Sequence, residues 1–372
     1  MTSTFSNMNG SNRWGEEIPI PEAPETPAQK EQRELLEALD QRKYDHATPP
    51  ERPEPIFKLT GQSIATPGNL VVIQGKAKSA KTALIEAMIG RAISDDDEGD
   101  YFELEAKLNP EGKALIHCDC EQSRYDADQV IRKALRRGNI SECPAWIRSY
   151  CLTDIDRKTR RKMLLAEMDR ASQECGGIYG VVLDGVGDLA LNVNDPEEAN
   201  GFVAELHARA IRCDTVIACV LHENPGENNT GGKTRGHLGS ELERKAETNL
   251  RLEKDKDEVT TVWSERSRHA SIPKGKGITF KWSDEHGMHR SCAPSSTVKE
   301  NAKLEEMRDL AAEIFDCEEA VGGLSHTATL KRIELLLELK REGARTRFRK
   351  LNKAGVIKEN CADLWVLAPK GT

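Results

Sequence analysis

Short apolar runs alternate with longer amphipathic segments through the middle of this chain. The runs are LVVIQ at 70–74, ALIHCD at 114–119, YGVVLD at 179–184 and TVIACVLHE at 215–223. Unbroken apolar runs of this length are typical of strands that are buried on both faces, as in parallel sheets. Segments with helical spacing lie between them, at 81–93, 124–137, 157–175 and 196–212. This alternating order predicts an α/β fold on a parallel sheet.

The two ends of the chain differ from this central region in composition and in hydrophobic pattern. Residues 1–55 are polar and proline-rich, which predicts a mostly disordered N-terminal arm containing one short charged helix at 29–43. An arm that folds on docking to a neighbouring subunit is the alternative. The α/β core is expected over 56–293, closed by a pair of strands at 260–266 and 277–282.

After the core, a polar linker is expected at 294–301, followed by a small module at 302–372. This module is predicted to contain helices, including 327–340 and 343–355, and then a hairpin formed by VIKEN and LWVLAP. Eleven Lys or Arg residues stand against five Asp or Glu between Ser325 and Thr372, so this end is basic. The pattern is similar to a winged helix. Its second helix carries Arg345, Arg347 and Arg349, which are candidates for contacting double-stranded DNA. A protein-docking module and a merely solvated basic face are the alternatives.

Composition narrows the class of protein. The 372-residue chain has a formal net charge of −8, so any contact with DNA must come from local basic features. The ten cysteines form no CxxC pair, which indicates reduced thiols in the core rather than a thiolate metal site. No apolar stretch is long enough to span a membrane and the N-terminus has no apolar signal segment, so we expect a cytoplasmic protein with no membrane partner.

A Walker A motif follows the first apolar run and precedes the first helical segment, which is the setting that the motif requires. It comprises Gly75, Lys76, Ala77, Lys78, Ser79, Ala80, Lys81 and Thr82. Backbone N–H groups of such a loop bind phosphates, while Lys81 is expected to reach the β- and γ-phosphates of ATP and Thr82 to bind Mg²⁺. The motif usually has glycine where this chain has Ala80, which puts the rate of turnover in doubt.

Acidic residues end two of the predicted strands. Asp184 has the position of a Walker B carboxylate, which orients Mg²⁺ and its water. Glu121 follows the strand after the Walker A helix and is a candidate general base for the attacking water. Asp119 is a weaker candidate for that role, and a solvated strand end is the alternative for each of these residues.

The order of motifs resembles the RecA-like core of replicative helicases, in particular hexameric RepA-type plasmid helicases and ATPases of mobile elements. The segments that carry the resemblance are GKAKSAKT, HCDCEQSRYDAD, YGVVLDGVGDL, VLHENPG, TRGHLGSELERKAE and SERSR. They lie between residues 56 and about 290. The resemblance implies a P-loop ATPase that takes part in DNA replication.

The resemblance also implies roles for individual residues. Glu121 would be the catalytic glutamate, and His222, with Asn224 close by, would sense the γ-phosphate. Lys233 and Arg235, in the loop 231–240, would contact single-stranded DNA in a central channel. Arg268 would be the arginine finger that completes the ATP site of a neighbouring subunit, with Arg266 as its helper. The alternatives are a strand-end histidine without a sensing role, a surface hairpin without a ligand, and solvated arginines.

The function expected from these observations is an ATP-hydrolysing motor that acts on DNA, resembles replicative helicases and assembles into a homo-oligomer, in particular a hexamer. An ATP-dependent helicase loader or DNA-binding regulator without unwinding activity has the same motifs and stays open. A repressor with a decayed ATP site and a strand-exchange recombinase are weaker alternatives.

Overall fold

The structure is a computed structural model that describes residues 25–223 and 236–369. Two compact units make up the chain, Met1–Arg52 and Pro53–Thr372. In the first unit, helix α1 (Pro27–Asp40) begins at Thr26, whose side chain forms a reciprocal capping box with Gln29. The helix predicted at 29–43 is therefore present, shifted toward the N-terminus by this cap and by a proline in its first turn. None of its residues is buried. Residues 1–24 of the predicted arm lie outside the described residues.

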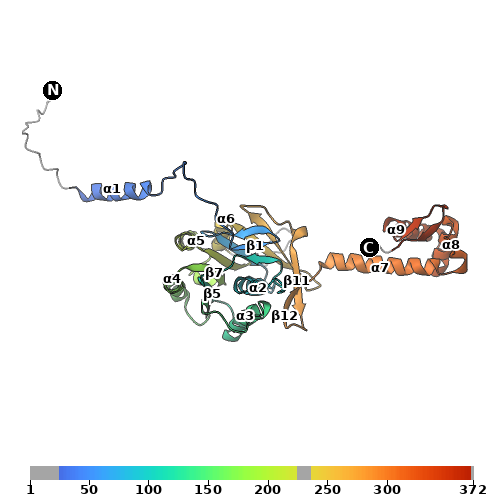
Figure 1. The fold of residues 1–372 in the computed structure, drawn as a ribbon, viewed down its shortest axis with the longest axis horizontal. Coiled ribbons are helices and arrows are strands. Elements are labelled where there is room, and N and C mark those ends of the chain that lie inside the picture. Colours follow the sequence, from blue (N-terminus) through green and yellow to red (C-terminus); the bar gives the residue numbers. More distant parts are fainter. Residues whose placement is uncertain (1–24, 224–235, 370–372) are drawn as a thin grey trace, which may run out of the picture. The chain divides into compact units, whose positions relative to one another are not determined.

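A nine-stranded, mostly parallel sheet forms the centre of the second unit (Figure 1). Its order is β12-β11-β10-β9-β3-β8-β7-β5-β6. The parallel strands are β3 (Leu70–Gly75), β5 (Ala114–Asp119), β6 (Ile147–Cys151), β7 (Ile178–Asp184), β8 (Val216–His222) and β9 (Thr248–Lys254). The antiparallel strands are β10 (Thr260–Ser267), β11 (Ile278–Ser283) and β12 (Met288–Ser291). The predicted α/β class and the predicted closing pair, β10 and β11, are confirmed.

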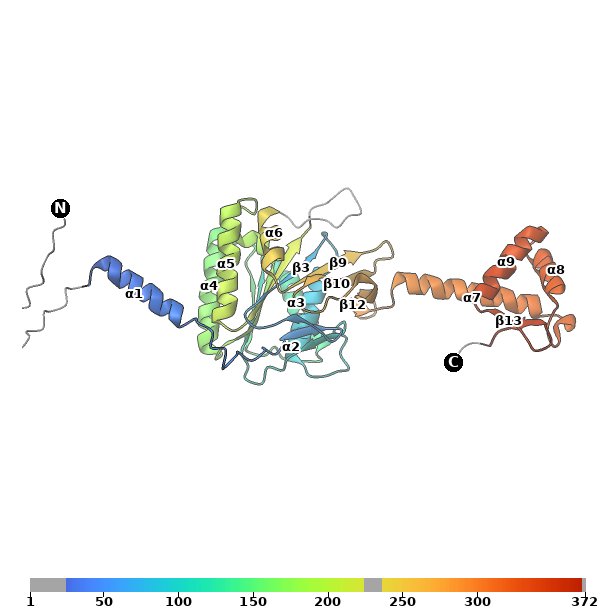
Figure 2. The same cartoon turned by 90° about the horizontal axis from the view of Figure 1, so that it is seen from above.

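Helices cover both faces of this sheet (Figure 2). Helices α2 (Lys81–Ile93) and α3 (Arg124–Arg137) share one apolar cluster with Val71, Ile73 and Leu115. Helices α4 (Arg157–Glu174), α5 (Pro196–Arg212) and α6 (Gly236–Lys245) share the other cluster with Leu70, Val72 and Ile116. The strand residues of the two clusters alternate along the chain, because successive strand side chains point to opposite faces.

Several strands were not predicted from the sequence. Strand β9 has the polar sequence TNLRLEK, yet its first five residues are buried, so an apolar run was the wrong criterion for it. Strand β6 is short and only partly buried at the edge of the sheet. A separate three-stranded sheet consists of β1 (Phe57–Leu59), β2 (Gln62–Ala65) and β4 (Leu104–Ala106). Strands of three or four residues are too short to show a period. Three short 3-10 helices lie among the described residues, at Val186–Leu189, Lys274–Lys276 and Glu318–Ala320.

The C-terminal residues form helices and a hairpin in the order predicted from the sequence. These elements are α7 (Ser295–Phe315), α8 (His326–Leu336), α9 (Arg341–Lys353), β13 (Ile357–Glu359) and β14 (Trp365–Leu367). They have an apolar cluster of their own, which includes Leu310, Ile333 and Leu351. The linker predicted at 294–301 is helical, since α7 already begins at Ser295. Pro294 pre-sets the entry to this helix, and no glycine or proline interrupts the residues that follow.

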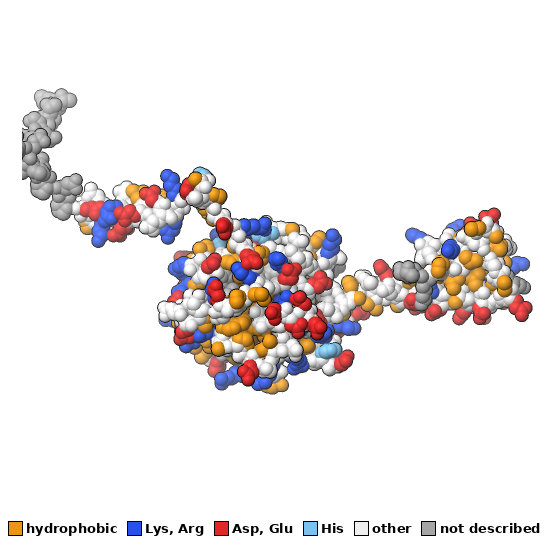
Figure 3. Space-filling model, in the orientation of Figure 1, with side chains coloured by type: hydrophobic (Ala, Val, Ile, Leu, Met, Phe, Trp, Pro, Cys, Tyr) orange, Lys and Arg blue, Asp and Glu red, His pale blue; other side chains and the backbone are white. Residues whose placement is uncertain are grey.

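Membrane-spanning helices, the cysteines and the surface charge also bear on the class of protein. Among the described residues, no helix combines the length and the apolar character needed to cross a membrane. All ten cysteines are free, and Cys118, Cys120 and Cys219 are buried in the core as small apolar residues. On the face seen in Figure 3, acidic and basic side chains are interspersed over the central body, with no large area of one sign.

Glycine at position 90 of α2 allows close packing against α3. A Cβ there would lie 2.9 Å from the backbone oxygen of Ala134 and 3.2 Å from the Cβ of Arg137. Gly90→Ala should therefore lower the free energy of unfolding by about 1–3 kcal/mol, although alanine is the better helix former. The matched control is Gly201→Ala on α5, where a Cβ has nothing within 4 Å. This change should raise stability by about 0.5–1 kcal/mol. Urea denaturation of both variants checks the prediction, and equal effects would contradict it.

Candidate functional site

The Walker A segment forms a tight turn between β3 and α2. A Cβ on Gly75 would lie 2.5 Å from Ser79 Oγ and 2.6 Å from the backbone oxygen of Leu252, so only glycine fits here. Ala80 adopts the left-handed conformation, with φ of 62°. Glycine adopts this conformation freely, whereas an L-residue with a Cβ is destabilised by about 1–2 kcal/mol. Position 80 therefore has a conformation typical of glycine although its residue is alanine.

The N-terminus of α2 faces a cleft beside this loop. No side chain caps the helix, so its first N–H groups and the positive end of its dipole are available to an anion. The cleft has a volume of about 280 Å³. It is lined by Lys78, Ser79, Ala80, Lys81, Thr82, Glu121, Asp184, His222, Lys254 and His289. The structure thus gathers residues from several strand ends around the Walker A segment.

Lys81 lies at the centre of a chain of polar contacts. Its buried ammonium group donates to the backbone oxygens of Gly75 and Lys76, at 3.2 Å each. Burial lowers the pKa of Lys81, and the charges of Glu121, Asp184 and Glu223 oppose this shift. The ammonium group also lies 3.1 Å from Nδ1 of His222.

His222 connects Lys81 to Glu121. An ammonium group only donates hydrogen bonds, so Nδ1 of His222 must accept, and the ring proton is then on Nε2. This Nε2 donates to Oε2 of Glu121 over 2.7 Å. The order Lys81, His222, Glu121 is therefore a directed chain of hydrogen bonds that holds the carboxylate of Glu121 in place.

Two further residues position Glu121 from the backbone side. Asp119 is fully buried, and its Oδ1 accepts the backbone N–H groups of Glu121 and Gln122 at 2.9 and 2.8 Å. This carboxylate therefore holds the turn after β5. Gly185 has a φ of 82°, and a Cβ there would lie 2.5 Å from Cγ of Glu121. Both the conformation and the close approach require glycine directly after Asp184.

Asp184 ends β7 beside Asp119, with which it is in register. The side-chain amide of Gln122 donates to both carboxylates, at 2.7 Å to Asp119 and 3.4 Å to Asp184. Asp184 is only 4% exposed. Burial raises its pKa to about 7, and the negative charges of Asp119 and Glu121 add to this effect. Oxygen ligands of this kind suit Mg²⁺, and the hydroxyl of Thr82 is part of the same cleft.

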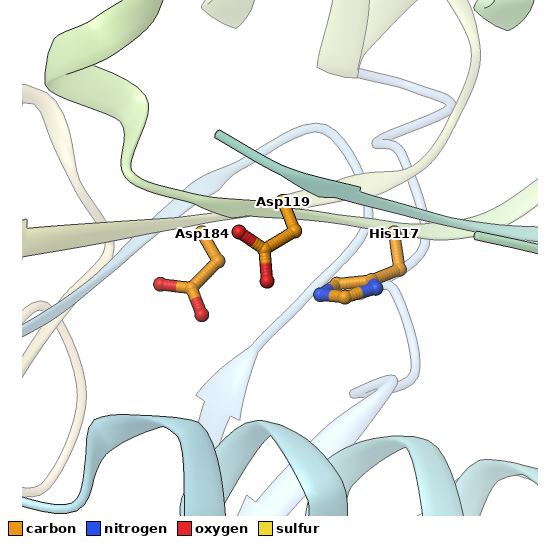
Figure 4. A group of neighbouring side chains, drawn as sticks. All are labelled: His117, Asp119 and Asp184. Carbon is orange, nitrogen blue, oxygen red and sulfur yellow. The ribbon is translucent and has the colours of Figure 1, made fainter. Parts of the chain in front are cut away.

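A buried histidine lies deeper along β5, below these carboxylates. His117, Asp119 and Asp184 offer ligand atoms that lie within 4.8 Å of one another, and Figure 4 shows their side chains on the same side of the sheet. Burial lowers the pKa of His117 to about 4, so its imidazole is neutral at pH 7. His117 could not be predicted as a site residue from the sequence, because it lies inside an apolar run that indicates only a strand.

The sequence also missed several residues of the cleft. Lys254 and His289 come from the ends of β9 and β12, which carry no motif. Burial lowers the pKa of His289 to about 4, with a further contribution from Lys254. Gln122 directly follows Glu121, and Gly185 directly follows Asp184. Adjacency to these candidate residues is the sequence feature that could have identified Gln122 and Gly185 as part of the site.

Arg266 and Arg268 lie at the opposite end of the sheet from the phosphate-binding loop of their own chain. Ser267 pairs with Thr248, which pairs with Val71 near the start of β3, whereas the loop follows its end. Arg266 is 71% exposed, with one long ion pair of 3.9 Å to Glu243. The register shifts between Ser264 and Arg266, and Arg268 lies just beyond β10, so the two arginines do not simply share one strand face.

Arg268 makes closer contacts within its own chain. Its guanidinium group donates to the backbone oxygen of Lys245 at 2.8 Å and to Oδ1 of Asn69 at 3.3 Å. The side chain is exposed despite these bonds. Neither arginine can reach the loop of its own chain from this end of the sheet, so any role at a phosphate must be in a second copy.

The candidate DNA-binding residues fall into two groups. Lys233 and Arg235, and also Asn224, lie outside the described residues. Arg345 and Arg349 are exposed on α9 and Arg347 is half-buried, whereas Ala344, Phe348 and Leu351 pack into the apolar cluster. Arg345 and Arg349 therefore lie on the side of the helix that faces away from that cluster.

No protein-family model matches this chain, and no curated protein matches it. Among solved structures, a RadB recombinase aligns with a TM-score of 0.42 and 17% identity over 62% of this chain and 93% of its own. A second solved structure, which is an ATPase domain, aligns with a TM-score of 0.45 and 12% identity over 70% of this chain and 98% of its own. Both TM-scores are below 0.5, so neither similarity indicates a function for this chain.

The raised pKa of Asp184 makes stability depend on pH. The folded-state value of about 7 lies above the ordinary value of 3.8, so the folded protein retains the proton that the unfolded chain loses. Ionisation therefore reduces stability progressively as the pH rises from about 4 to about 7. Asp184→Asn should be close to neutral at pH 4 and stabilise the metal-free protein at pH 7.5, by roughly 4 kcal/mol at most. Urea denaturation in EDTA at both pH values measures the difference, and parallel pH profiles would contradict the prediction.

Proposed function

We propose that this protein is an ATP-hydrolysing motor that acts on DNA. The observation that carries the proposal is the hydrogen-bond chain from Lys81 through His222 to Glu121, which meets Asp184 at one cleft beside the phosphate-binding loop. An amine, a polar relay, a candidate base and a metal-binding carboxylate are the parts that phosphoryl transfer from ATP to water requires.

In this proposal the loop and the N-terminus of α2 bind the phosphates of ATP. Thr82 and Asp184 would hold Mg²⁺, for which their hydroxyl and carboxylate oxygens are suitable ligands. The bound ion would supply positive charge that offsets the charge on the phosphates. Lys81 exchanges its contacts with the backbone oxygens of the loop for contacts with phosphate oxygens. Lys78 and Lys254 bring further cations to the same cleft.

Glu121 acts as the general base in this proposal. Asp119 and Gly185 set the position of its backbone and side chain, and His222 holds its carboxylate. Because His222 also contacts Lys81, any change at the phosphates that moves Lys81 is transmitted to Glu121 through one imidazole ring. This contact gives the γ-phosphate sensor role proposed for His222 a physical basis.

Arg266 and Arg268 would act on the ATP of a neighbouring copy. Their distance from their own loop along the sheet supports action across an interface, and makes hydrolysis depend on assembly. Arg266 is the less constrained of the two, since Arg268 is held by Asn69 and Lys245. We propose a ring, in particular a hexamer, in line with the resemblance to RepA-type helicases.

Contacts with DNA would come from two basic segments. Lys233 and Arg235 are proposed to contact single-stranded DNA, on the basis of their motif. Arg345, Arg347 and Arg349 are proposed to contact double-stranded DNA, if the C-terminal residues act as a winged helix. The exposed basic side of α9 supports the second contact.

Replacing Glu121 tests the proposed chemistry. Glu121→Gln should keep ATP binding within about twofold and lower turnover by roughly 10²–10⁴-fold, the range for loss of a general base. Gly185→Ala should produce the same loss of turnover, because its Cβ would displace the side chain of Glu121. Fluorescent-nucleotide binding and phosphate release measure the two properties. Glu105→Gln, which removes an exposed carboxylate on β4, is the matched control.

Two outcomes of these binding and turnover measurements would contradict the proposal. Normal turnover in Glu121→Gln would remove Glu121 as the base, and failure of the wild-type protein to bind ATP would end the proposal as a whole. Lys81→Ala should abolish binding, since it removes the one buried ammonium group that the described cleft places beside the loop.

Mixed assemblies test the role of the arginines. Arg266→Ala and Arg268→Ala should each retain ATP binding and lose turnover, with the larger loss identifying the finger. Mixing either variant with Glu121→Gln should restore part of the activity, because some interfaces then pair an intact loop with an intact arginine. Phosphate release across a series of mixing ratios measures the rescue. Activity that merely follows the fraction of each variant would contradict a shared site.

A helicase loader or DNA-binding regulator is the second candidate function, since it would use the same ATP site. The acidic overall charge and the strained Ala80 are compatible with a slow switch as well as with a motor. Strand displacement on a forked DNA substrate separates the two. Unwinding by an assembled, ATP-hydrolysing preparation supports the motor, and its absence from such a preparation supports the regulator.

A further inference from the structure

One polar atom beneath the proposed ATP site has no partner. Nε2 of His117 makes no hydrogen bond within the protein. The residue has no exposed surface, so bulk water does not reach this atom either. We propose that His117, Asp119 and Asp184 form a binding site for a divalent transition metal. This site differs from the proposed Mg²⁺ site in that one of its ligands is a nitrogen atom.

The sheet itself brings these ligands together. His117 and Asp119 are two residues apart on β5, so both point to the face that packs against α2, as Leu115 does. Asp184 is the register partner of Asp119 on β7. The ligand atoms of the three residues all lie within 4.8 Å of one another, which small side-chain rotations convert into a common coordination sphere (Figure 4).

Ser149 supports the histidine in the way that metal sites require. It is the register partner of His117 on β6, and its Oγ lies 2.9 Å from Nδ1 of the imidazole. A metal-binding histidine commonly donates its second ring N–H to a neighbouring oxygen, which fixes the tautomer and aims the other nitrogen at the ion. In the tautomer whose Nδ1–H donates to Ser149, the lone pair on Nε2 faces the carboxylates.

That arrangement favours a cation for electrostatic reasons. When both carboxylates are ionised, a nitrogen lone pair and two buried carboxylates repel one another, and a bound divalent cation would offset that repulsion. Asp119 retains acceptor capacity on Oδ2, which accepts a single bond from Gln122, whereas Oδ1 already accepts two backbone bonds. The ion would thus take one oxygen from each carboxylate.

The donor set selects the class of metal. One imidazole nitrogen and two carboxylate oxygens suit borderline cations such as Zn²⁺, Co²⁺ and Mn²⁺, whereas Mg²⁺ prefers oxygen ligands and retains several waters. The nearby thiols are excluded from this site. Cys118 belongs to the apolar cluster on the opposite face of the sheet, because it alternates with His117 and Asp119 along β5.

Binding at this site would affect the proposed ATPase, and this consequence rests on the proposed function. Asp184 cannot serve a transition metal below the cleft and Mg²⁺ within it through the same oxygens. Zn²⁺ should therefore inhibit turnover, and the inhibition should depend on His117.

Cobalt binding without nucleotide tests the site independently of any ATPase activity. The tag-free, full-length protein is titrated with Co²⁺ and followed by its visible absorption. We expect a saturable d–d spectrum without the near-ultraviolet charge-transfer band that sulfur ligands produce, and displacement by Zn²⁺. His117→Leu should weaken binding by at least about tenfold, and Ser149→Ala, which leaves all three ligands in place, by about the same order.

The matched control is His286→Gln, which removes an exposed histidine on the turn between β11 and β12 and should leave cobalt affinity unchanged. The proposal is overturned if wild-type protein shows no saturable binding, if the spectrum has a sulfur band, or if His117→Leu and Ser149→Ala both bind as wild type does. If His117→Leu does not fold, Ser149→Ala decides the question. Cobalt binding with no ATPase activity in the wild type would reject the proposed function and leave this site standing.

Discussion

The structure depends on keeping opposite charges together at one buried edge of the sheet. Lys81, Asp119 and Asp184 are all buried there, and the charges of Lys81 and Asp184 stabilise each other. Burial lowers the pKa of the amine and raises that of Asp184, and their mutual attraction opposes both shifts. Parallel strands make this possible, because the carboxyl ends of β5 and β7 deliver Asp119 and Asp184 to the same edge, where α2 begins at Lys81. The site therefore follows from the direction of the strands.

Close approach of the backbone is the second requirement of this edge. Gly75 and Gly185 leave room for Ser79 and for Glu121, respectively, and no side chain larger than hydrogen fits at either position. Lys78 and Ala80 differ from these glycines, since both hold a left-handed conformation with a Cβ. The surrounding contacts of β3 and α2 over-determine the loop, so it keeps its shape at a local cost in stability. Under the proposed function, a strained loop and a tightly placed Glu121 together suit a site whose turnover is controlled rather than fast.

The distance between the two ends of the sheet bears on assembly. One end holds the cleft, and the other holds Arg266 and Arg268, with the length of β9 and β10 between them. A single chain cannot bring the two together without breaking the sheet. Under the proposed function, copies must therefore be arranged so that one chain's arginine end meets another chain's cleft. A repeated contact of this head-to-tail kind closes into a ring when its rotation allows.

The sequence alone determined the α/β class, the main helices, the Walker A loop and the positions of Asp184 and Glu121. These features are encoded locally, by apolar runs, helical spacing and a motif of consecutive residues. Only the tertiary structure decided the contact between Lys81 and His222, which are 141 positions apart, and the strand identity of the polar segment β9. It also decided that His117 faces two carboxylates and that Ala80 stays left-handed. Register between strands and the direction of each side chain depend on packing against distant segments, and no local pattern contains that information.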